Sequence, residues 1–279
     1  MRIFRHSKNL PKKFQKAVIA IGNFDGVHLG HESLIKKAQQ IATQSMRPLA
    51  ALTFEPHPVS LFKKGMEPFR LTPFFSKAHE LERLGIDALI ILRFNYEFSQ
   101  QSAKSFITNI LVKKLNASHI VSGCDFVFGS KRSGNCSLLL KAGKELGFDC
   151  TALSPIKTAN GDICSSTYIR SCLRNGKLKE ANLVLGRNHS IQGRVSHGEK
   201  LGRKLGFPTA NIYLREHIRP KFGVYAVRLY FLDKSQCSGF NGVASIGNRP
   251  TIDGKGDILE VYIFNFKQNI YQKRVRVEL

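Results

Sequence analysis

Short apolar runs alternate with segments of helical period through residues 16–185. Five strand-like runs lie near residues 17–21, 49–54, 88–94, 119–122 and 150–153. Between them, apolar residues recur on one helical face, most clearly over residues 32–42, and similarly over 76–84, 102–115 and 137–146. This alternation predicts an α/β fold, a parallel sheet with helices on both faces.

The pattern changes after residue 185, where strand-like segments follow one another without a helix between them. These segments are residues 190–196, 209–214, 224–232, 242–246, 259–266 and 274–279. Six consecutive strands predict a small, closed, antiparallel β-barrel. We therefore expect two domains, residues 1–185 and 186–279.

Composition places the chain among ordinary globular proteins, because 42% of its 279 residues are hydrophobic and 23% are charged. The longest apolar runs are far too short to span a bilayer, and the basic N-terminus is not followed by a long apolar stretch, so we expect neither a membrane span nor a signal peptide. The six cysteines form no C-x-x-C pair. Reduced thiols and a cytoplasmic location are the expectation, and a zinc site is not.

The net charge of +23 is spread over both halves of the chain and is not gathered in one tail or stripe. A diffuse positive charge favours small anionic ligands, whereas a dense basic patch is typical of nucleic-acid binding. A basic nucleic-acid-binding or regulatory protein is kept as an alternative.

The segment of residues 21–31 joins the first apolar run to the first helical segment and carries His28 and His31. Helix starts have N–H groups without intrahelical partners and a partial positive charge, so they bind phosphate. Imidazoles there can donate hydrogen bonds to phosphoryl oxygens, and glycines allow a close approach. The predicted nucleotide-binding residues of this loop are Gly22, Asn23, Phe24, Asp25 and Gly30.

A second segment, residues 165–170, resembles a helix start with Arg170 one turn in. Its serine and threonine hydroxyls and the guanidinium are suited to holding a triphosphate, and Ser165, Ser166 and Thr167 are predicted to bind nucleotide. A capped helix with a surface arginine is the alternative.

Aromatic residues follow two other predicted strands. Asp125, Phe126 and Phe128 come after one strand end, and Phe54, His57 and Pro58 come at another. Phe126 and Phe128 either stack on a planar ring or belong to the core, and the pattern leaves both interpretations open. The segment with Phe54, His57 and Pro58 is expected to line the same cleft.

In the second half, a glycine-rich basic segment precedes a strand. Thr209 and Asn211 alternate on that strand and thus share a face, and their oxygens are hard ligands suited to Mg²⁺. Glu260 lies within an apolar strand and is either a solvent-facing residue or a base. The predicted nucleotide-binding residues here are Gly193, His197, Gly202, Arg203, Gly206 and Pro208.

Taken together, these motifs resemble the bacterial bifunctional riboflavin kinase/FMN adenylyltransferase family, also called FAD synthetases. The motifs occur in the family's order, as GNFDGVHLGH (22–31), TFEPHP (53–58), DFVFG (125–129), SSTYIR (165–170), LGR (185–187), GRKLGFPTAN (202–211), GVYAV (223–227) and GNRPT (247–251), with Glu260 last.

The resemblance implies a Rossmann-like nucleotidyltransferase domain followed by a riboflavin kinase barrel. The barrel would phosphorylate riboflavin to FMN, and the first domain would transfer AMP from ATP to FMN, giving FAD and pyrophosphate. It implies that His28, His31 and Arg170 act on the ATP phosphates and that Asp125 lies near the flavin phosphate. It also implies that Thr209 and Asn211 bind Mg·ATP and that Glu260 is the catalytic base.

Three features depart from the family's pattern, all in the barrel. Tyr262 and Asn265 stand where a histidine and an aspartate are usual, and Tyr271-Gln272 replaces a Tyr-Gly turn. The sequence ends at Leu279, before the usual arginine-bearing segment and helix. An FMN adenylyltransferase with an impaired kinase domain is therefore a second hypothesis. The oligomeric state stays open.

Overall fold

The computed structural model describes residues 1–5, 10–62, 65–197, 207–233, 238–247 and 257–279. The chain divides into two compact units. Unit 1 comprises residues 1–66 and 74–164, and unit 2 comprises residues 67–73 and 165–279. The domain boundary that the sequence indicates, near residue 185, stays a prediction.

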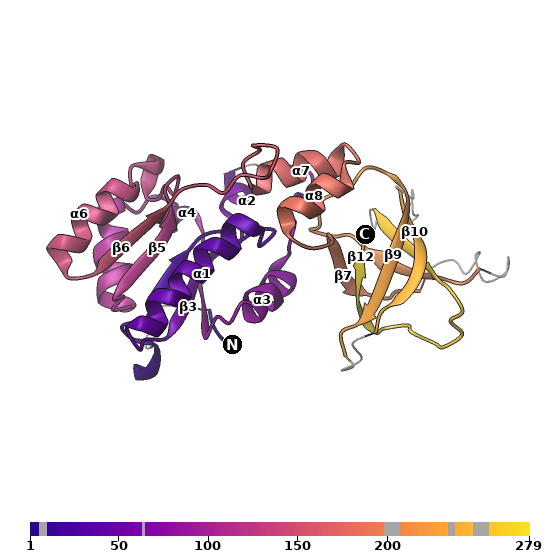
Figure 1. Ribbon diagram of the computed structural model, residues 1–279, viewed down its shortest axis with the longest axis horizontal. Helices are drawn as coiled ribbons and strands as arrows, with labels where there is room; N and C mark the ends of the chain where they lie inside the picture. The colour runs from indigo at the N-terminus through magenta and orange to yellow at the C-terminus, as the bar shows by residue number, and fades with distance from the viewer. Residues whose placement is uncertain (6–9, 63–64, 198–206, 234–237, 248–256) are drawn as a thin grey trace. The chain divides into compact units, whose positions relative to one another are not determined.

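Unit 1 contains a six-stranded sheet in which every pair of neighbours is parallel (Figure 1). The strand order is β1-β4-β3-β2-β5-β6. The strands are β1 (Arg2–Phe4), β2 (Val18–Ile21), β3 (Leu49–Glu55), β4 (Ala88–Arg93), β5 (His119–Gly123) and β6 (Asp149–Leu153). The predicted parallel sheet is confirmed, and β1 is an additional edge strand that the apolar pattern did not indicate.

The helices of unit 1 cover both faces of this sheet. They are η1 (Lys12–Phe14), α1 (Leu29–Gln44), α2 (Pro58–Phe62), α3 (Phe74–Arg83), α4 (Tyr96–Ser99), α5 (Ala103–Ser105), the π-helical η2 (Phe106–Lys114), η3 (Ser130–Arg132) and α6 (Cys136–Leu146). Because side chains alternate along a strand, Ile19 and Ile21 of β2 pack in one core with Phe106, while Val18 packs in the other with Ile35 of α1. Two apolar layers thus hold the sheet between helices.

Unit 2 contains a six-stranded antiparallel sheet in the order β7-β12-β9-β10-β11-β8. The strands are β7 (Ser190–Arg194), β8 (Thr209–Tyr213), β9 (Gly223–Phe231), β10 (Phe240–Gly247), β11 (Ile258–Ile263) and β12 (Arg274–Glu278). A bridge between Ser196 and Asn211 joins the two ends of this order, so the sheet nearly closes on itself. The predicted six-stranded barrel is confirmed, with one apolar core inside it.

Two helices, α7 (Ser166–Arg174) and α8 (Leu178–Leu185), precede the barrel within unit 2. The short segment 67–73 also belongs to this unit, because Arg70 forms a parallel bridge with His217. The Arg70 N–H donates to the carbonyl of Glu216, and the Ile218 N–H donates to the carbonyl of Arg70.

Among the described residues, no helix has both the length and the apolar character needed to cross a membrane. The five described cysteines are all free thiols. Burial raises the pKa of Cys164, and burial together with nearby Cys136 raises the pKa of Cys150 to about 11. These thiols are therefore protonated at neutral pH and suited to packing.

Candidate functional site

The loop between β2 and α1 is a tight, buried turn. Phe24 and Val27 have positive φ angles of 50° and 42°, and Gly26 has a φ of 91°. A left-handed conformation is costly for a β-branched residue such as Val27 and persists only where packing holds it. Phe24, Val27 and the carboxylate-bearing Asp25 are almost fully buried, so the surrounding core fixes this turn.

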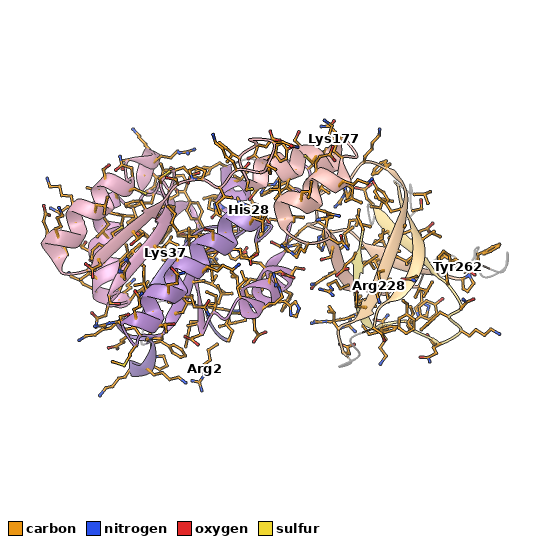
Figure 2. The ribbon with its side chains drawn as sticks, in the orientation of Figure 1. Arg2, His28, Lys37, Lys177, Arg228 and Tyr262 are labelled. Atoms are coloured by element: carbon orange, nitrogen blue, oxygen red, sulfur yellow. The ribbon has the colours of Figure 1, made fainter. Side chains whose placement is uncertain are left out.

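His28 and His31 lie together at the start of α1. His28 is the N-cap residue of α1, with an extended backbone, and Figure 2 marks it at that end of the helix. The imidazole rings of His28 and His31 stack, with centroids 3.7 Å apart and an angle of 24° between the planes. The edge of Phe24 contacts His31 at a centroid distance of 5.3 Å. The predicted histidine pair is thus a single preformed unit at a helix N-terminus.

Gly30 lies between the two histidines, at a position with little room for a side chain. A Cβ atom on Gly30 would lie 3.1 Å from ring atoms of His28 and 3.2 Å from the carbonyl oxygen of Cys164. These distances are shorter than ordinary van der Waals contacts. The glycine therefore permits the stacked pair, and Cys164 directly precedes the Ser165 helix cap in the sequence.

A buried lysine that the sequence analysis missed connects this loop to the end of β3. Lys77 of α3 donates to the carbonyl of Asn23 at 3.2 Å and to the hydroxyl of Thr53 at 3.1 Å, and it pairs with the Glu55 carboxylate at 2.6 Å. We call these four residues the lysine network. The helical period of residues 76–84 shows that Lys77 lies on a helix, but no sequence signal places it inside the core.

The phenylalanines predicted to contact flavin form one aromatic cluster. Phe128 lies 5.3 Å from Phe106, and Phe54 lies 6.4 Å from the same ring. Phe126 stacks on Phe128 with centroids 5.5 Å apart. Phe54 and Phe128 are buried in the core, whereas Phe126 is only partly buried. Of these three, Phe126 is the ring best placed to contact a ligand.

Other residues at this edge of the sheet vary in exposure. Asp125 is exposed and turns back over the end of β5, because a Cβ on Gly123 would lie 2.6 Å from its Oδ1. His57 is buried, and its Nδ1 accepts a hydrogen bond from the Val59 N–H at 3.2 Å. Phe62, which the sequence analysis did not select, is 63% exposed at the end of α2 and lies 6.1 Å from Phe94.

The Ser165–Arg170 segment starts α7 in unit 2, as the helix-cap interpretation predicts. The Ser165 hydroxyl accepts a hydrogen bond from the Tyr168 N–H at 3.2 Å. Arg170 is partly exposed, and its Nε donates to the carbonyl of Phe69 at 2.9 Å while its guanidinium lies 5.3 Å from the Phe69 ring. Segment 67–73 thus anchors Arg170. Roles for Ser166, Thr167 and Arg170 toward a nucleotide stay predictions.

In the barrel, strand register brings Asn211 and Glu260 opposite each other. Glu260 of β11 pairs with Asn211 of β8 on one side and with Ser245 of β10 on the other. Their strand neighbours, including Ala210 and Val261, point into the barrel core, so these three polar residues lie on its outer face. Directly opposed residues have Cβ atoms about 5 Å apart. We call Asn211, Glu260 and Ser245 the outer row.

Thr209 lies on the same face, two residues from Asn211 and opposite Tyr262. Its hydroxyl and the Asn211 amide oxygen are hard donors on one edge of the outer row, which suits Mg²⁺. No cluster of three or more His, Cys, Asp or Glu residues that could hold a metal ion occurs in the described part of the chain. The Thr209 hydroxyl and the Asn211 amide oxygen are the groups that would hold Mg²⁺ there.

Some of the remaining barrel residues predicted to bind nucleotide lie in the described part of the chain, and others lie outside it. Gly193 allows close packing inside the barrel, because a Cβ there would lie 2.6 Å from Cγ2 of Ile212. His197 stacks on Tyr271 with centroids 3.9 Å apart, and Pro208 directly precedes β8. Gly202, Arg203 and Gly206 lie outside the described residues.

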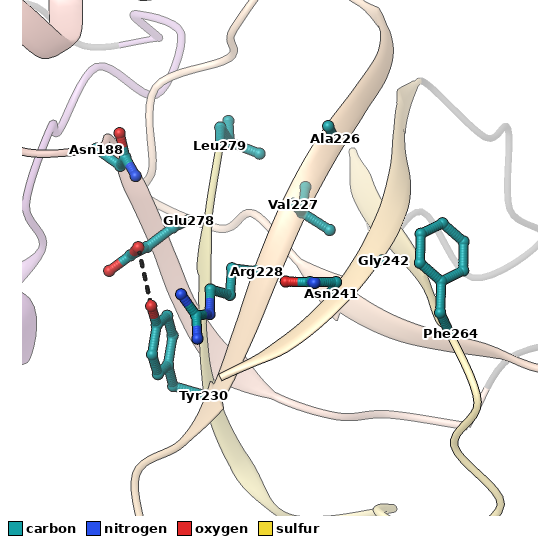
Figure 3. Close-up of a pocket in the computed structure, with 10 residues that line it drawn as sticks. All are labelled: Asn188, Ala226, Val227, Arg228, Tyr230, Asn241, Gly242, Phe264, Glu278 and Leu279. Atoms are coloured by element: carbon teal, nitrogen blue, oxygen red, sulfur yellow. Dashed lines mark hydrogen bonds between the residues drawn. The ribbon is translucent and has the colours of Figure 1, made fainter. Parts of the chain in front are cut away.

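A hollow of about 360 Å³ opens on the outer face of the barrel (Figure 3). Its lining includes Arg228, Tyr230, Asn241, Phe264 and Glu278, with the Tyr230 hydroxyl donating to Glu278 at 3.3 Å. Asn241 is four residues from Ser245 on β10, so it lies on the same face as the outer row, about 13 Å along the strand. A polar and aromatic hollow thus shares a face with Glu260.

The histidine pair at a helix start and the polar outer row of the barrel are compatible with one class of protein, a two-part enzyme that transfers phosphate-containing groups. Two family models match the chain, one for each part. An FAD synthetase model matches residues 10–168, and a riboflavin kinase model matches residues 185–279. The chain belongs to the bifunctional riboflavin kinase/FMN adenylyltransferase family.

Relatives of known description extend over the whole chain. Bifunctional riboflavin kinase/FMN adenylyltransferases of Buchnera aphidicola (subsp. Schizaphis graminum) and Haemophilus influenzae are each 42% identical to it, over 100% of this chain and 89% of the relative. The Escherichia coli K12 enzyme is 39% identical over 100% of this chain and 88% of its own length. These matches favour the bifunctional enzyme over the alternatives considered from the sequence.

A solved structure supports the complete two-part fold. A Streptococcus pneumoniae protein described as a macrolide-efflux protein has a TM-score of 0.84 and 30% identity to this chain, covering 99% of this chain and 88% of that one. The similarity therefore includes both the parallel sheet and the barrel.

Proposed function

We propose that this chain phosphorylates riboflavin to FMN in its barrel and adenylylates FMN to FAD in its N-terminal domain, residues 1–185, using ATP in both steps. The observation that carries this proposal is the presence of both an FAD synthetase and a riboflavin kinase domain on one chain, each with a preformed polar constellation. Small anionic substrates also suit the diffuse charge of +23. Because both steps consume ATP, the proposed function agrees with the cytoplasmic location expected from the sequence.

In the adenylyl transfer, a phosphate oxygen of FMN attacks the α-phosphorus of ATP. The bond from that phosphorus to the oxygen bridging to the β-phosphorus breaks, and pyrophosphate leaves. The nucleophile is already an anion, so the reaction needs alignment and charge stabilisation more than a strong base. The stacked His28 and His31 at the start of α1 supply directed donors beside a positively polarised helix end.

Other residues are assigned to this step by their place in the family's motifs. We assign Ser165, Ser166, Thr167 and Arg170 to the ATP phosphates, together with the loop residues Gly22, Asn23, Phe24, Asp25 and Gly30. The partial exposure of Phe126 and the exposure of Asp125 support a flavin-binding role at the end of β5. The buried Phe54, Phe128 and His57 support that surface from beneath.

In the kinase step, the terminal hydroxyl of the riboflavin side chain attacks the γ-phosphorus of ATP, and ADP leaves. The hydroxyl must lose a proton, and Glu260 on the outer row is the acceptor that we assign. Mg²⁺ held by Thr209 and Asn211 would neutralise charge on the transferred phosphoryl group. The hollow beside Arg228 and Phe264 offers a place for the flavin ring on the same barrel face.

The proposal is tested by incubating the purified chain with ATP and Mg²⁺ and separating the flavins by chromatography. Riboflavin should give both FMN and FAD, and FMN alone should give FAD. FAD from FMN with no product from riboflavin would support the adenylyltransferase-only hypothesis. Failure to form FAD from FMN, together with salt-sensitive binding of RNA or DNA, would support the nucleic-acid alternative.

A further inference from the structure

Lys77 is a charged residue in the interior of unit 1. Its side chain is 0% exposed, and its ammonium makes three polar contacts, to Asn23, Thr53 and Glu55. Moving an ammonium group out of water is costly unless a counter-ion and hydrogen bonds replace the lost hydration. Glu55 provides the counter-ion, and two oxygens provide the hydrogen bonds.

The contacts of Lys77 converge on one carbonyl. The Asn23 oxygen receives a hydrogen bond from the Lys77 ammonium at 3.2 Å and another from the Thr53 hydroxyl, also at 3.2 Å. Thr53 and Glu55 belong to β3, a central strand of the sheet, so they form a rigid base for these bonds. The lysine network therefore ties the β2–α1 loop to the neighbouring strand.

The tied carbonyl directly precedes the costly turn. Asn23 is followed by Phe24 with a φ of 50°, and Val27 with a φ of 42° comes three residues later, immediately before His28. A turn in a rarely populated conformation relaxes when its outside contacts are removed. Relaxation here would shift the start of α1 and the stacked histidines with it.

We propose that Lys77 is a positioning residue for adenylyl transfer, acting through the Asn23 carbonyl to hold the turn that presents His28 and His31. This inference rests on the adenylyl transfer proposed for residues 1–185. A positioning role needs no contact between Lys77 and either substrate, because the bonds to the Asn23 carbonyl, Thr53 and Glu55 act on the loop and on β3. A misplacement of about 1 Å in an aligned site can cost about 10²-fold in rate.

The test is a Lys77→Met variant, with FAD formation from FMN and FMN formation from riboflavin measured on the same preparation. FAD formation should lose about 10²-fold in kcat with a smaller change in KM for ATP, because alignment is lost while the ATP-binding groups remain. The kinase step should stay within about twofold of wild type, since Glu260 and Asn211 lie in the barrel. A kcat for FAD formation within about threefold of wild type would overturn the proposal.

A double variant separates positioning from stability. Lys77→Met leaves Glu55 without its ammonium, and adding Glu55→Gln removes that carboxylate charge and should restore part of the lost melting temperature. The kcat for FAD formation should stay low, because the bond to Asn23 is still missing. Recovery of kcat together with melting temperature would show that Lys77 is only structural and would overturn the proposal.

If the Lys77→Met variant fails to fold, the Thr53→Val variant tests the positioning role in its place. It removes one of the two donors to the Asn23 carbonyl and keeps the Lys77–Glu55 ion pair, so a fall of about fivefold in kcat for FAD formation is expected. An unchanged kcat would overturn the proposal. A wild-type chain that makes no FAD would instead refute the proposed function, so the two failures are distinguishable.

Discussion

The two units position their candidate catalytic groups in different ways. In unit 1, His28 and His31 stand on a strained loop and a helix start, and the lysine network holds that loop from a distant part of the sequence. In the barrel, strand register alone sets Glu260 opposite Asn211. A site built on a loop depends on remote residues, whereas a site built on paired strands depends mainly on the sheet that carries it.

The largest expected effect tests the barrel side of this comparison. Glu260→Gln keeps the size of the side chain and removes its ability to accept a proton. FMN formation from riboflavin should fall by about 10²–10⁴-fold, while FAD formation from FMN should not change. Separate assays of the two steps measure this, and a kinase rate close to wild type would refute the assignment of Glu260 as base.

The reciprocal change tests unit 1. His28→Ala removes one ring of the stacked pair and one directed donor, so FAD formation should fall by about 10²–10³-fold. FMN formation should be unaffected. An equal loss of both activities would indicate a folding defect, and circular dichroism of the variant distinguishes that outcome.

Two helix caps provide a matched pair with a smaller effect. Ser165→Ala removes the cap of α7, and Asn135→Ala removes the cap of α6, whose side chain accepts from the Leu138 N–H. Each should lower the free energy of unfolding by about 1 kcal/mol, measured by urea denaturation. Only Ser165→Ala should also slow FAD formation, since Ser165 is assigned to ATP. Equal activities in the two variants would leave Ser165 as a structural cap.

The smallest expected effect is a loss of thermal stability at acidic pH. Burial lowers the pKa of His119 on β5, and this imidazole contacts the Thr151 hydroxyl at 2.8 Å. The unfolded state therefore binds a proton at this histidine more readily than the folded state does. His119 contributes to stability above its unfolded pKa of about 6.5, and this contribution is lost as the pH falls toward the lower pKa of the folded state. Thermal unfolding of wild type at pH 7.5 and pH 5.5 should therefore show a decrease that is smaller in His119→Gln. An identical decrease in both proteins would contradict this.

Much of the fold follows from local patterns. The apolar run predicted near residues 49–54 is β3, Leu49–Glu55, and the helical period over residues 32–42 lies within α1. These patterns are readable because burial demands a period of two along strands and 3.6 along helices. The pattern did not reveal β1, since a three-residue edge strand has too few residues to show a period.

The candidate site was only partly predictable. The residues of the His28 loop, together with Asn211 and Glu260 of the outer row, were selected by type and spacing, and their motifs sufficed for the family resemblance. Ser245 of the outer row was not selected, because only strand register places it beside Glu260. Lys77 was not selected, because its neighbours along the chain give no sign that its ammonium lies beside Asn23 and Glu55. Phe128 was left undecided between core and ligand contact, and Phe54 was expected to line the same cleft; the structure buries both in the core of unit 1.

By itself, the sequence determined most of the strands and helices along the chain, the parallel sheet and barrel, and the presence of two sets of phosphate-transfer motifs. These depend on side-chain type and local spacing, which are written directly in the chain. Only the tertiary structure decided that His28 and His31 stack, that Glu260 faces Asn211 and that Lys77 is buried beneath the loop. The contacts of Glu260 with Asn211 and of Lys77 with Asn23 join residues far apart in sequence, and strand register and packing, which no local pattern encodes, bring them together. The stacking of His28 on His31 is local in sequence but depends on the buried turn before α1.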